Sequence, residues 1–265
     1  VLTDDADRAA EVADELDRVN HERRHTEQRI LFAAEAQVAE QGDQPAYVLH
    51  GDDWHPGVVG IVASRIAERY HRPAVLIAMD GGVGKGSGRS IAKLHLRDAL
   101  AECAATLVRF GGHRAAAGVT IESDQVAAFA RRFNEVAASR LIHEDLVPEV
   151  KIDLEVAIGR ADETLERVLR HFEPFGIGNP TPVLVARGVR LAGPPKIVGR
   201  DGLKLRLSTG AGELEAIGWG MADRAGDFDP AVPVDIAFRL ERDEYRGESR
   251  LQARIADITP RALGG

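Results

Sequence analysis

The first 41 residues contain neither proline nor glycine, and this uninterrupted stretch constrains the fold more than any other feature of the chain. Because proline and glycine are the strongest helix breakers, residues 4–40 predict one long helix, with Thr3 or Asp4 able to cap its start. Its apolar positions form only a thin stripe: Val12, Leu16, Val19, Ile30 and Val38. A long helix with so little apolar surface typically connects two folded bodies, and Gly42 is expected to end it.

The hydrophobic pattern changes twice after this helix. Short apolar strands first alternate with helices, which predicts an α/β domain with a mixed sheet flanked by helices. The expected strands are 47–50, 74–79, 85–91 and 116–121, and the expected helices are 57–70, 94–108 and 124–141. From residue 183 onward about six short strands follow one another, which predicts a small all-β barrel of the OB type.

These changes of pattern divide the chain into four parts. We predict a linker helix over residues 1–42, an α/β domain over 43–145, a connector over 146–182 and a β-barrel over 183–265.

Composition indicates an ordinary globular protein, with 44% apolar and 29% charged residues. No stretch is apolar enough to span a bilayer, and the acidic start resembles neither a signal nor a transit peptide, so we expect no membrane partner. The single cysteine, Cys103, excludes an internal disulfide and a cysteine-based zinc cluster, and it is expected to be buried. A cytoplasmic location fits these features.

Charge is distributed unevenly along the chain, although the net charge is −8. Residues 1–45 hold twelve acidic and five basic side chains, whereas residues 65–114 hold nine basic and four acidic ones. Because the local field determines what a polyanion meets, the positive window is a candidate surface for phosphate or nucleic acid.

Two glycine-dense segments lie in this positive window, 84–90 and 111–113. As turns, they would let backbone N–H groups approach an anion closely. Arg89 offers a planar fork suited to phosphate, and nearby positions add shorter donors. The candidate site residues are Arg65, Ser87, Gly88, Arg89, Ser90, Gly111, Gly112 and His113, with His55 at the preceding helix entrance.

Each of these features also has a purely structural interpretation. Residues 82–90 could form a simple hairpin turn, and residues 111–113 a helix C-cap followed by a core histidine. Trp54 and His55 could simply pack at a helix entrance. Lys85 is not followed by the serine or threonine of a P-loop.

No catalytic arrangement is evident from the residues alone. His21-Glu22-Arg23-Arg24-His25 matches the zinc-protease pattern, but its polar helix offers no dry pocket, so we interpret it as a solvated face. We therefore expect no metal site, and the residues predict a protein that binds phosphorylated ligands without a visible catalyst. In the β region the positions that could bind a polyanion are Lys196, Arg200, Lys204, Arg206 and Tyr245.

Several motifs, in order, resemble the RecJ family of single-stranded-DNA-specific exonucleases, in the DHH/DHHA1 phosphoesterase superfamily. Residues 54–65 (WHPGVVGIVASR), Gly86-Ser87-Gly88-Arg89-Ser90 and Gly111-Gly112-His113 resemble the family's DHHA1 domain. Residues 174–180 (PFGIGNP) and the β region resemble its OB-type domain, and the first helix is similar to its linker between the DHH and DHHA1 domains.

The resemblance implies the DNA-binding part of a 5′→3′ exonuclease of DNA repair and recombination. In this family a DHH domain holds two divalent ions, Mn²⁺ or Mg²⁺, that activate water. No Asp-His-His occurs in the sequence, so we expect the chain to start past that domain, to bind no cofactor itself and to be inactive alone. By motif, Arg65, Ser87 and Arg89 would hold phosphates, and His113 with the amides of Gly111 and Gly112 would reach the scissile phosphate. The barrel, with Lys204 and Arg206, would guide single-stranded DNA.

Two other functions remain open at this point. The full enzyme could be a phosphodiesterase for short oligonucleotides or cyclic dinucleotides, although the OB-type region argues against it. The chain could also be a non-catalytic interaction module that docks a single-strand-binding protein or a helicase.

Overall fold

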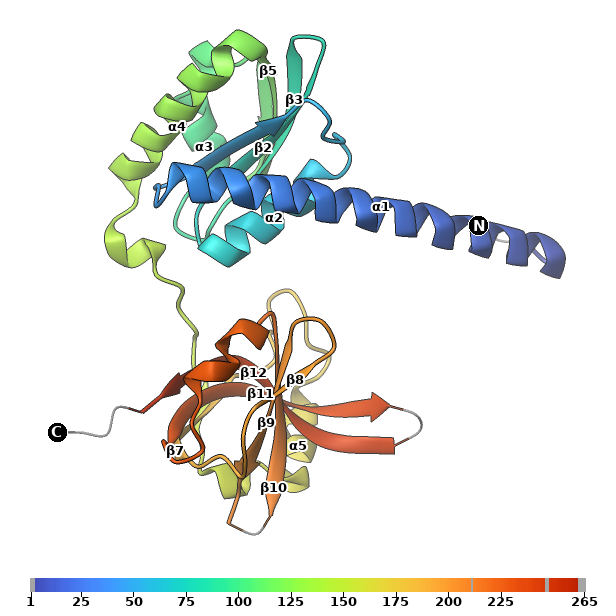
Figure 1. The fold of residues 1–265 in the computed structure, drawn as a ribbon, viewed down its shortest axis with the longest axis vertical. Coiled ribbons are helices and arrows are strands. Elements are labelled where there is room, and N and C mark those ends of the chain that lie inside the picture. Colours follow the sequence, from blue (N-terminus) through green and yellow to red (C-terminus); the bar gives the residue numbers. More distant parts are fainter. Residues whose placement is uncertain (1–2, 211, 246–247, 262–265) are drawn as a thin grey trace. The chain divides into compact units, whose positions relative to one another are not determined.

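The computed structural model describes residues 3–210, 212–245 and 248–261, which form two compact units (Figure 1). Unit 1 is Val1–Pro148 and unit 2 is Glu149–Gly265. Each unit has its own sheet and its own buried core, so each is described by itself.

Unit 1 is built on a five-stranded mixed sheet. Its strands lie in the order β1-β2-β3-β5-β4, with β1 parallel to β2 and the remaining pairs antiparallel. They are β1 (Tyr47–Gly51), β2 (Ala74–Asp80), β3 (Val83–Arg89), β4 (Arg109–Gly112) and β5 (Ala116–Glu122). The side chains of successive β2 residues point to opposite faces of the sheet, so Ile77 packs in one core and Leu76 in another. Because both faces are buried, the sequence of this strand is continuously apolar.

Helices cover both faces of this sheet, as predicted. α1 (Ala6–Gln41) and α2 (Val59–Tyr70) share one core with the sheet, and α3 (Leu96–Ala101) and α4 (Val126–Arg140) share the other. The buried residues of α1 all lie in its second half: Glu27, Ile30, Ala34 and Val38. The first half of the helix extends past the unit (Figure 1). Side chains of α1 also bond the free side of β1: Gln37 donates to the carbonyl of His50 and accepts its N–H, and Gln41 donates to the carbonyl of Val48.

The first glycine-dense segment lies in β3, so the strand predicted over residues 85–91 is confirmed and the alternative interpretation as a turn was wrong; the second lies in β4 up to Gly112, with His113 beyond the strand. Gly84, Gly86 and Gly88 are the positions of β3 that face the α3 and α4 side. A Cβ on Gly86 would lie 2.6 Å from Val119 Cγ2 and 3.0 Å from Ile77 Cγ1. These glycines therefore make room for large neighbours on β2 and β5, a packing role that local sequence does not reveal.

The helix expected over residues 94–108 was also wrong in extent. α3 ends at Ala101, a 3₁₀ turn follows over Ala104–Thr106, and the chain then enters β4. Cys103 lies between the two helical segments and is buried, as expected.

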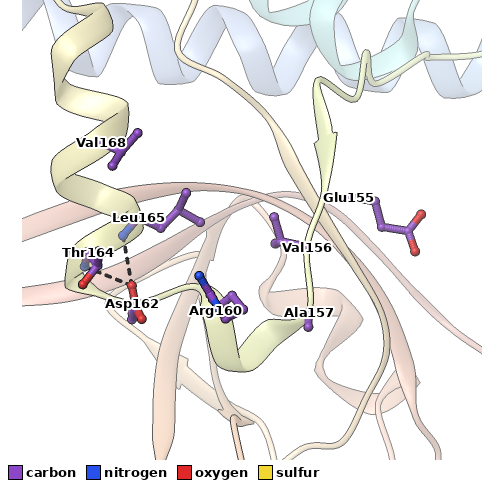
Figure 2. Close-up of a pocket in the computed structure, with 8 residues that line it drawn as sticks. All are labelled: Glu155, Val156, Ala157, Arg160, Asp162, Thr164, Leu165 and Val168. Atoms are coloured by element: carbon purple, nitrogen blue, oxygen red, sulfur yellow. Dashed lines mark hydrogen bonds between the residues drawn. The ribbon is translucent and has the colours of Figure 1, made fainter.

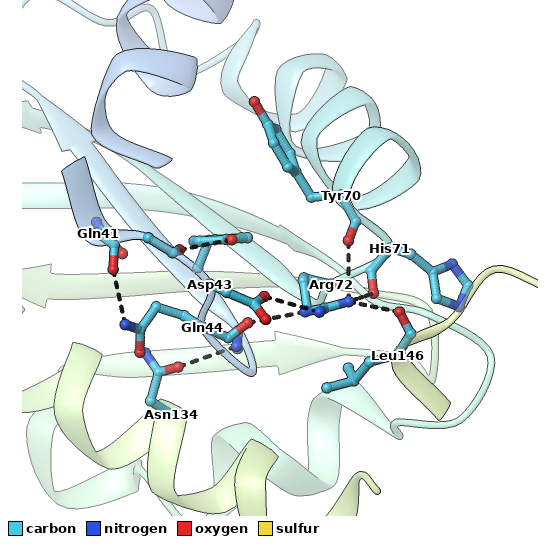
Figure 3. Close-up of polar contacts among 11 residues, drawn as sticks. Gln41, Asp43, Gln44, Tyr70, His71, Arg72, Asn134 and Leu146 are labelled. Carbon is cyan, nitrogen blue, oxygen red and sulfur yellow. Dashed lines mark hydrogen bonds and ion pairs between the residues drawn. The ribbon is translucent and has the colours of Figure 1, made fainter. Parts of the chain in front are cut away.

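Arg72 connects three separate segments of unit 1 (Figure 3). Its guanidinium donates to the carbonyls of Gln44, Tyr70, His71 and Leu146 and pairs with Asp43. Its side chain is only 11% exposed, so this planar fork satisfies otherwise unpaired carbonyls at the end of α2.

Unit 2 contains the predicted OB-type barrel. Its sheet has the order β6-β7-β11-β12-β10-β9-β8, and β10 and β12 are parallel. Residues just after β7 close the barrel against β9: Ser208 N–H donates to Arg190 O, and Ala192 N–H donates to Arg206 O. The strands are β6 (Leu154–Glu155), β7 (Leu184–Val189), β8 (Lys196–Val198), β9 (Gly202–Ser208), β10 (Glu213–Trp219), β11 (Val234–Tyr245) and β12 (Glu248–Pro260).

The residues before the barrel belong to unit 2 and pack on its core. β6 pairs with β7, and α5 (Glu163–Leu169) places Leu165 and Leu169 against the barrel. Further 3₁₀ turns lie at Ser123–Gln125, His143–Leu146, Ile158–Arg160, Arg170–Phe172 and Ala222–Asp227. None of the helices in the described ranges combines the length and the apolar character that crossing a bilayer requires.

Candidate functional site

On the α2 side of the unit 1 sheet, part of the surface consists of bare backbone. Ser87 on β3 is paired with Gly118 on β5, and Gly118 is paired with Gly111 on β4. Cross-strand partners share a face, and both glycines are exposed, so beside Ser87 the sheet presents no side chains. We call this surface the glycine floor. A chain-like ligand can approach the backbone closely there.

Three cations surround the glycine floor on the same face. Arg89 lies two residues after Ser87 on β3, and Lys85 lies two residues before it. Lys85 is paired with Thr120 on β5, and Thr120 is paired with Arg109 on β4. Within the described ranges, no carboxylate comes within ion-pair distance of Lys85, Arg89 or Arg109. Their positive charge therefore remains available to an anion.

Arg89 is held in a defined position at the edge of α2. Its guanidinium donates to Ser87 Oγ over 3.0 Å and to the carbonyl of Gly88 over 2.9 Å. Gly60 on α2 permits this arrangement, since a Cβ there would lie 3.0 Å from Ser87 Oγ and 3.4 Å from Arg89 Nη2. α2 thus packs beside the Arg89 guanidinium without covering it.

The turn between β4 and β5 brings His113 to the same end of the sheet. Ser90 N–H donates to the carbonyl of Ala115, which ties the end of β3 to this turn, and Ser90 Oγ donates to Leu94 O. His113 N–H donates to Ala116 O over 2.8 Å, while its imidazole is exposed and forms no hydrogen bond within the described chain. Gly112 has φ +145° and leaves no room for a Cβ against Ala116 O, so only glycine suits this turn.

Two predicted residues near α2 have local structural partners. His55 lies in the turn that leads into α2: its carbonyl accepts the N–H groups of Val58 and Val59, and its exposed ring accepts from Gly57 N–H. Arg65 points to α1 instead of the glycine floor, with Nη2 2.6 Å from Glu27 Oε1. Glu27 is buried and also accepts from Arg23, so this carboxylate offsets the charge of Arg65.

Two of the predicted cations of the barrel, Lys204 and Arg206, are likewise engaged in ion pairs. Lys204 Nζ lies 2.7 Å from Glu215 Oε1 on the neighbouring strand. Arg206 pairs with Glu213 over 3.1 Å and donates to the carbonyl of Ala192. The side chain of Tyr245 lies outside the described part of the structure.

In the part of the chain that is described, no three His, Cys, Asp or Glu side chains are grouped so that they could hold a metal ion. Burial raises the pKa of Cys103 to about 11, so its thiol stays protonated at neutral pH. A hollow beside α5 is lined by groups with structural roles, such as Asp162, which accepts the N–H groups of Thr164 and Leu165 (Figure 2).

Sequence reasoning missed Lys85 and Arg109 as site residues. The alternation of Lys85, Ser87 and Arg89 was a usable signal, because residues two apart share one face of a strand. It was overlooked because the glycines at the intervening positions were interpreted as an anion-binding turn, although a strand was also predicted over residues 85–91.

In comparisons with known proteins, one family model matches within each of the two units. Residues 42–139 match the DHHA1 domain and residues 152–257 match the RecJ OB domain. The chain is 32% identical over 263 residues to the single-stranded-DNA-specific exonuclease RecJ of Bacillus subtilis, covering 97% of this chain and 33% of that protein. It is 33% identical over 273 residues to RecJ of Escherichia coli, covering 98% of this chain and 47% of the relative.

A solved structure gives the same result at the level of the fold. The crystal structure of RecJ from Thermus thermophilus in complex with Mg²⁺ superposes with a TM-score of 0.76 at 33% identity. The match covers 100% of this chain and 40% of that chain. The present chain therefore spans a third to about half of the length of these relatives.

Proposed function

Since the chain belongs to the RecJ family and carries its DHHA1 and OB domains, we propose that it is the single-stranded-DNA-binding part of a RecJ-type 5′→3′ exonuclease. Its role would lie in DNA repair and recombination. The observation that carries the proposal is the glycine floor flanked by Lys85, Arg89 and Arg109.

The chemistry of this surface suits a nucleic-acid backbone. Unpaired cations attract phosphates without regard to base sequence, and a guanidinium can bind one phosphate through two parallel N–H groups. We assign phosphate binding to Arg89 and Ser87, with Gly88 and Ser90 in the same motif. His113, together with Gly111 and Gly112, would contact a neighbouring phosphate at the end of the sheet. Arg65 would join them only by leaving Glu27.

Hydrolysis is assigned to a DHH domain that binds Mn²⁺ or Mg²⁺, because the described residues offer no metal-binding group. No catalytic step is therefore ascribed to this chain, and we expect it to be inactive alone. In this proposal residues 1–42 link the DHH domain to the DHHA1 domain. A single-strand-binding protein or a helicase remains a candidate protein partner.

The proposal is tested by fluorescence anisotropy of a labelled, 5′-phosphorylated single-stranded oligonucleotide in the presence of Mn²⁺. Arg89→Ala removes a charged phosphate contact, so we expect the affinity to fall roughly tenfold or more and the salt slope to decrease by about one. Arg132→Ala is the matched control, because this arginine lies on α4 and already pairs with Glu102 and Glu135.

The outcomes separate the candidate functions. Salt-dependent binding that weakens only in Arg89→Ala, without cleavage, supports the proposal. Tighter binding of a dinucleotide or cyclic dinucleotide than of a long strand would favour the phosphodiesterase for small substrates. If no nucleic acid binds, the protein-docking function becomes the better account. Cleavage by the purified chain would contradict its predicted inactivity.

A further inference from the structure

Glu27 is a buried carboxylate between the two helices that share one core with the unit 1 sheet. It lies on α1, its side chain is only 4% exposed, and two guanidinium groups approach it. Arg23 comes from the same helix, one turn earlier, and Arg65 comes from α2. Because one carboxylate faces two cations, either arginine can leave while the other still neutralises the buried charge.

The two arginines are bound to Glu27 in different ways. Arg23 donates to Glu27 Oε2 over 2.7 Å, and its Nε and Nη2 also donate to Asn20 Oδ1. Arg65 Nη2 lies 2.6 Å from Glu27 Oε1, yet this oxygen accepts no hydrogen bond from any described residue. Arg65 is therefore held by charge without the alignment of a hydrogen bond, and its side chain is 53% exposed. Of the two partners, Arg65 is the one that can leave.

The path from Arg65 to the glycine floor crosses the exposed side of α2. Arg65 shares one face of the helix with Ile61, which is exposed. Gly60, which adjoins Ser87 and Arg89, lies about 140° around the helix from Arg65 at 3.6 residues per turn. The guanidinium would pass Ile61 and then Gly60, and Gly60 has no side chain to obstruct it.

We propose that Glu27 is a positioning residue that competes with the phosphates of a bound strand for Arg65. While Arg65 pairs with Glu27, it adds little to the positive charge beside the glycine floor. When a phosphate takes Arg65, Arg23 remains to neutralise the buried carboxylate. Since Glu27 belongs to α1, the affinity for phosphate would depend on how this long helix packs against α2. The inference rests on the proposed function and adds a residue outside the glycine floor that sets its affinity.

Glu27→Gln removes the competing charge at nearly unchanged volume. In anisotropy titrations of a labelled, 5′-phosphorylated oligothymidylate, we expect this variant to bind roughly two- to fivefold more tightly than wild type, the factor for a partly exposed ion pair. Its salt slope should steepen by about 0.7, the value for one more phosphate contact on a single strand. Adding Arg65→Ala should cancel both gains. Gains that persist without Arg65 would overturn the proposal.

Arg23→Gln should have the opposite effect, and this sign separates competition from damage to the helix. Without Arg23, the departure of Arg65 would leave the buried Glu27 unpaired, so the strand should bind more weakly than it does to wild type. In the Glu27→Gln background, Arg23→Gln should have no effect. Simple damage to α1 would weaken binding in both single variants and would contradict the proposal.

Two matched controls use ion pairs of the same helices. Glu35→Gln frees Arg69, which lies nine positions after Gly60 and about half a turn around α2 from it, too far along the helix to reach the glycine floor. Arg18→Gln breaks an exposed pair with Glu22 on α1. Neither control should change the affinity or the salt slope.

The outcomes separate this inference from the proposed function. If Arg89→Ala weakens binding but Glu27→Gln does not strengthen it, the competition is refuted and the proposed function stands. If Glu35→Gln strengthens binding as much as Glu27→Gln does, a general change of charge explains both, and the competition is again refuted. Thermal unfolding checks that each variant folds. If Glu27→Gln does not fold, Arg23→Gln decides alone: an affinity equal to that of Arg18→Gln would overturn the proposal. If neither wild type nor any variant binds the strand, both proposals fail.

Discussion

At the scale of single residues, Arg72 shows how one guanidinium can organise a surface of loops. It bonds four carbonyls and one carboxylate from the segments before β1, after α2 and at residue 146 (Figure 3). Lysine could supply the charge at this position but not the planar fork of donors.

We expect Arg72→Ala to lower the free energy of unfolding of unit 1 by about 3 kcal/mol, because several charge-assisted hydrogen bonds are lost at a nearly buried site. Arg72→Lys should recover only part of this loss. Urea unfolding measures the change. In the control Arg69→Ala, which breaks the exposed pair with Glu35, the change should stay below about 1 kcal/mol. Equal effects of the two alanine variants would contradict this role for Arg72.

Individual residues also show which parts of the candidate site could be predicted from the sequence. The motifs named Ser87, Arg89 and His113 as candidate phosphate ligands, and the structure brings all three to one end of the sheet, while their role stays a prediction. The ion pairs of Lys204 and Arg65 could not be foreseen, since their partners, Glu215 and Glu27, are brought close by strand register and helix packing.

At the scale of elements, β3 shows that glycine can be required by the core and not by a turn. Every second residue of the strand is a glycine on the side of α3 and α4, and the intervening residues Lys85, Ser87 and Arg89 face the other way. One strand thus serves close packing on one face and the glycine floor on the other.

Gly86→Ala should therefore destabilise unit 1 by roughly 1–3 kcal/mol, since the new methyl group would overlap Val119 and Ile77. Gly118→Ala on the adjacent strand is the control: its Cβ would meet only Gly86 O at 3.8 Å, so the free energy of unfolding should change little. Thermal or urea unfolding of both variants checks this, and a neutral Gly86→Ala would mean that glycine there serves function alone.

Elements with a strong period were predicted well, and weakly patterned ones were not. α1 and α4 have long regular sequences without glycine or proline, α2 has a clear amphipathic pattern despite Gly60, and all three were predicted close to their observed bounds. The predicted helix over 94–108 was too long, because the apolar run continues after Ala101 although Cys103 enters the core from irregular backbone. Hydrophobicity predicted burial there but not the end of the helix.

At the scale of the whole molecule, the change from alternating α/β to all-β signals predicted two architectures correctly. The closure of the barrel could not be predicted from the sequence, because it depends on backbone hydrogen bonds between residues 190–192 and β9, which have no local sequence signal. The structure also gives each unit a separate core, so the units should respond separately to mutations.

Ile66→Ala and Leu205→Ala test this independence, because each side chain is at most 1% exposed in the core of one unit. Each should lower the stability of its own unit by about 2–5 kcal/mol. In a Trp219→Phe background, emission from Trp54 reports on unit 1 alone. Its unfolding midpoint should move with Ile66→Ala and stay unchanged with Leu205→Ala. A common shift would show that the two units unfold as one.

The glutamines of α1 have a consequence for how this protein behaves in a crowded solution. β1 is an outer strand of its sheet, and an unpaired outer strand is a template onto which another molecule can add its own strand. Gln37 and Gln41 occupy the backbone groups that such an intruding strand would need. The side chains of the long helix therefore shield this edge of the sheet from pairing with a strand of another molecule.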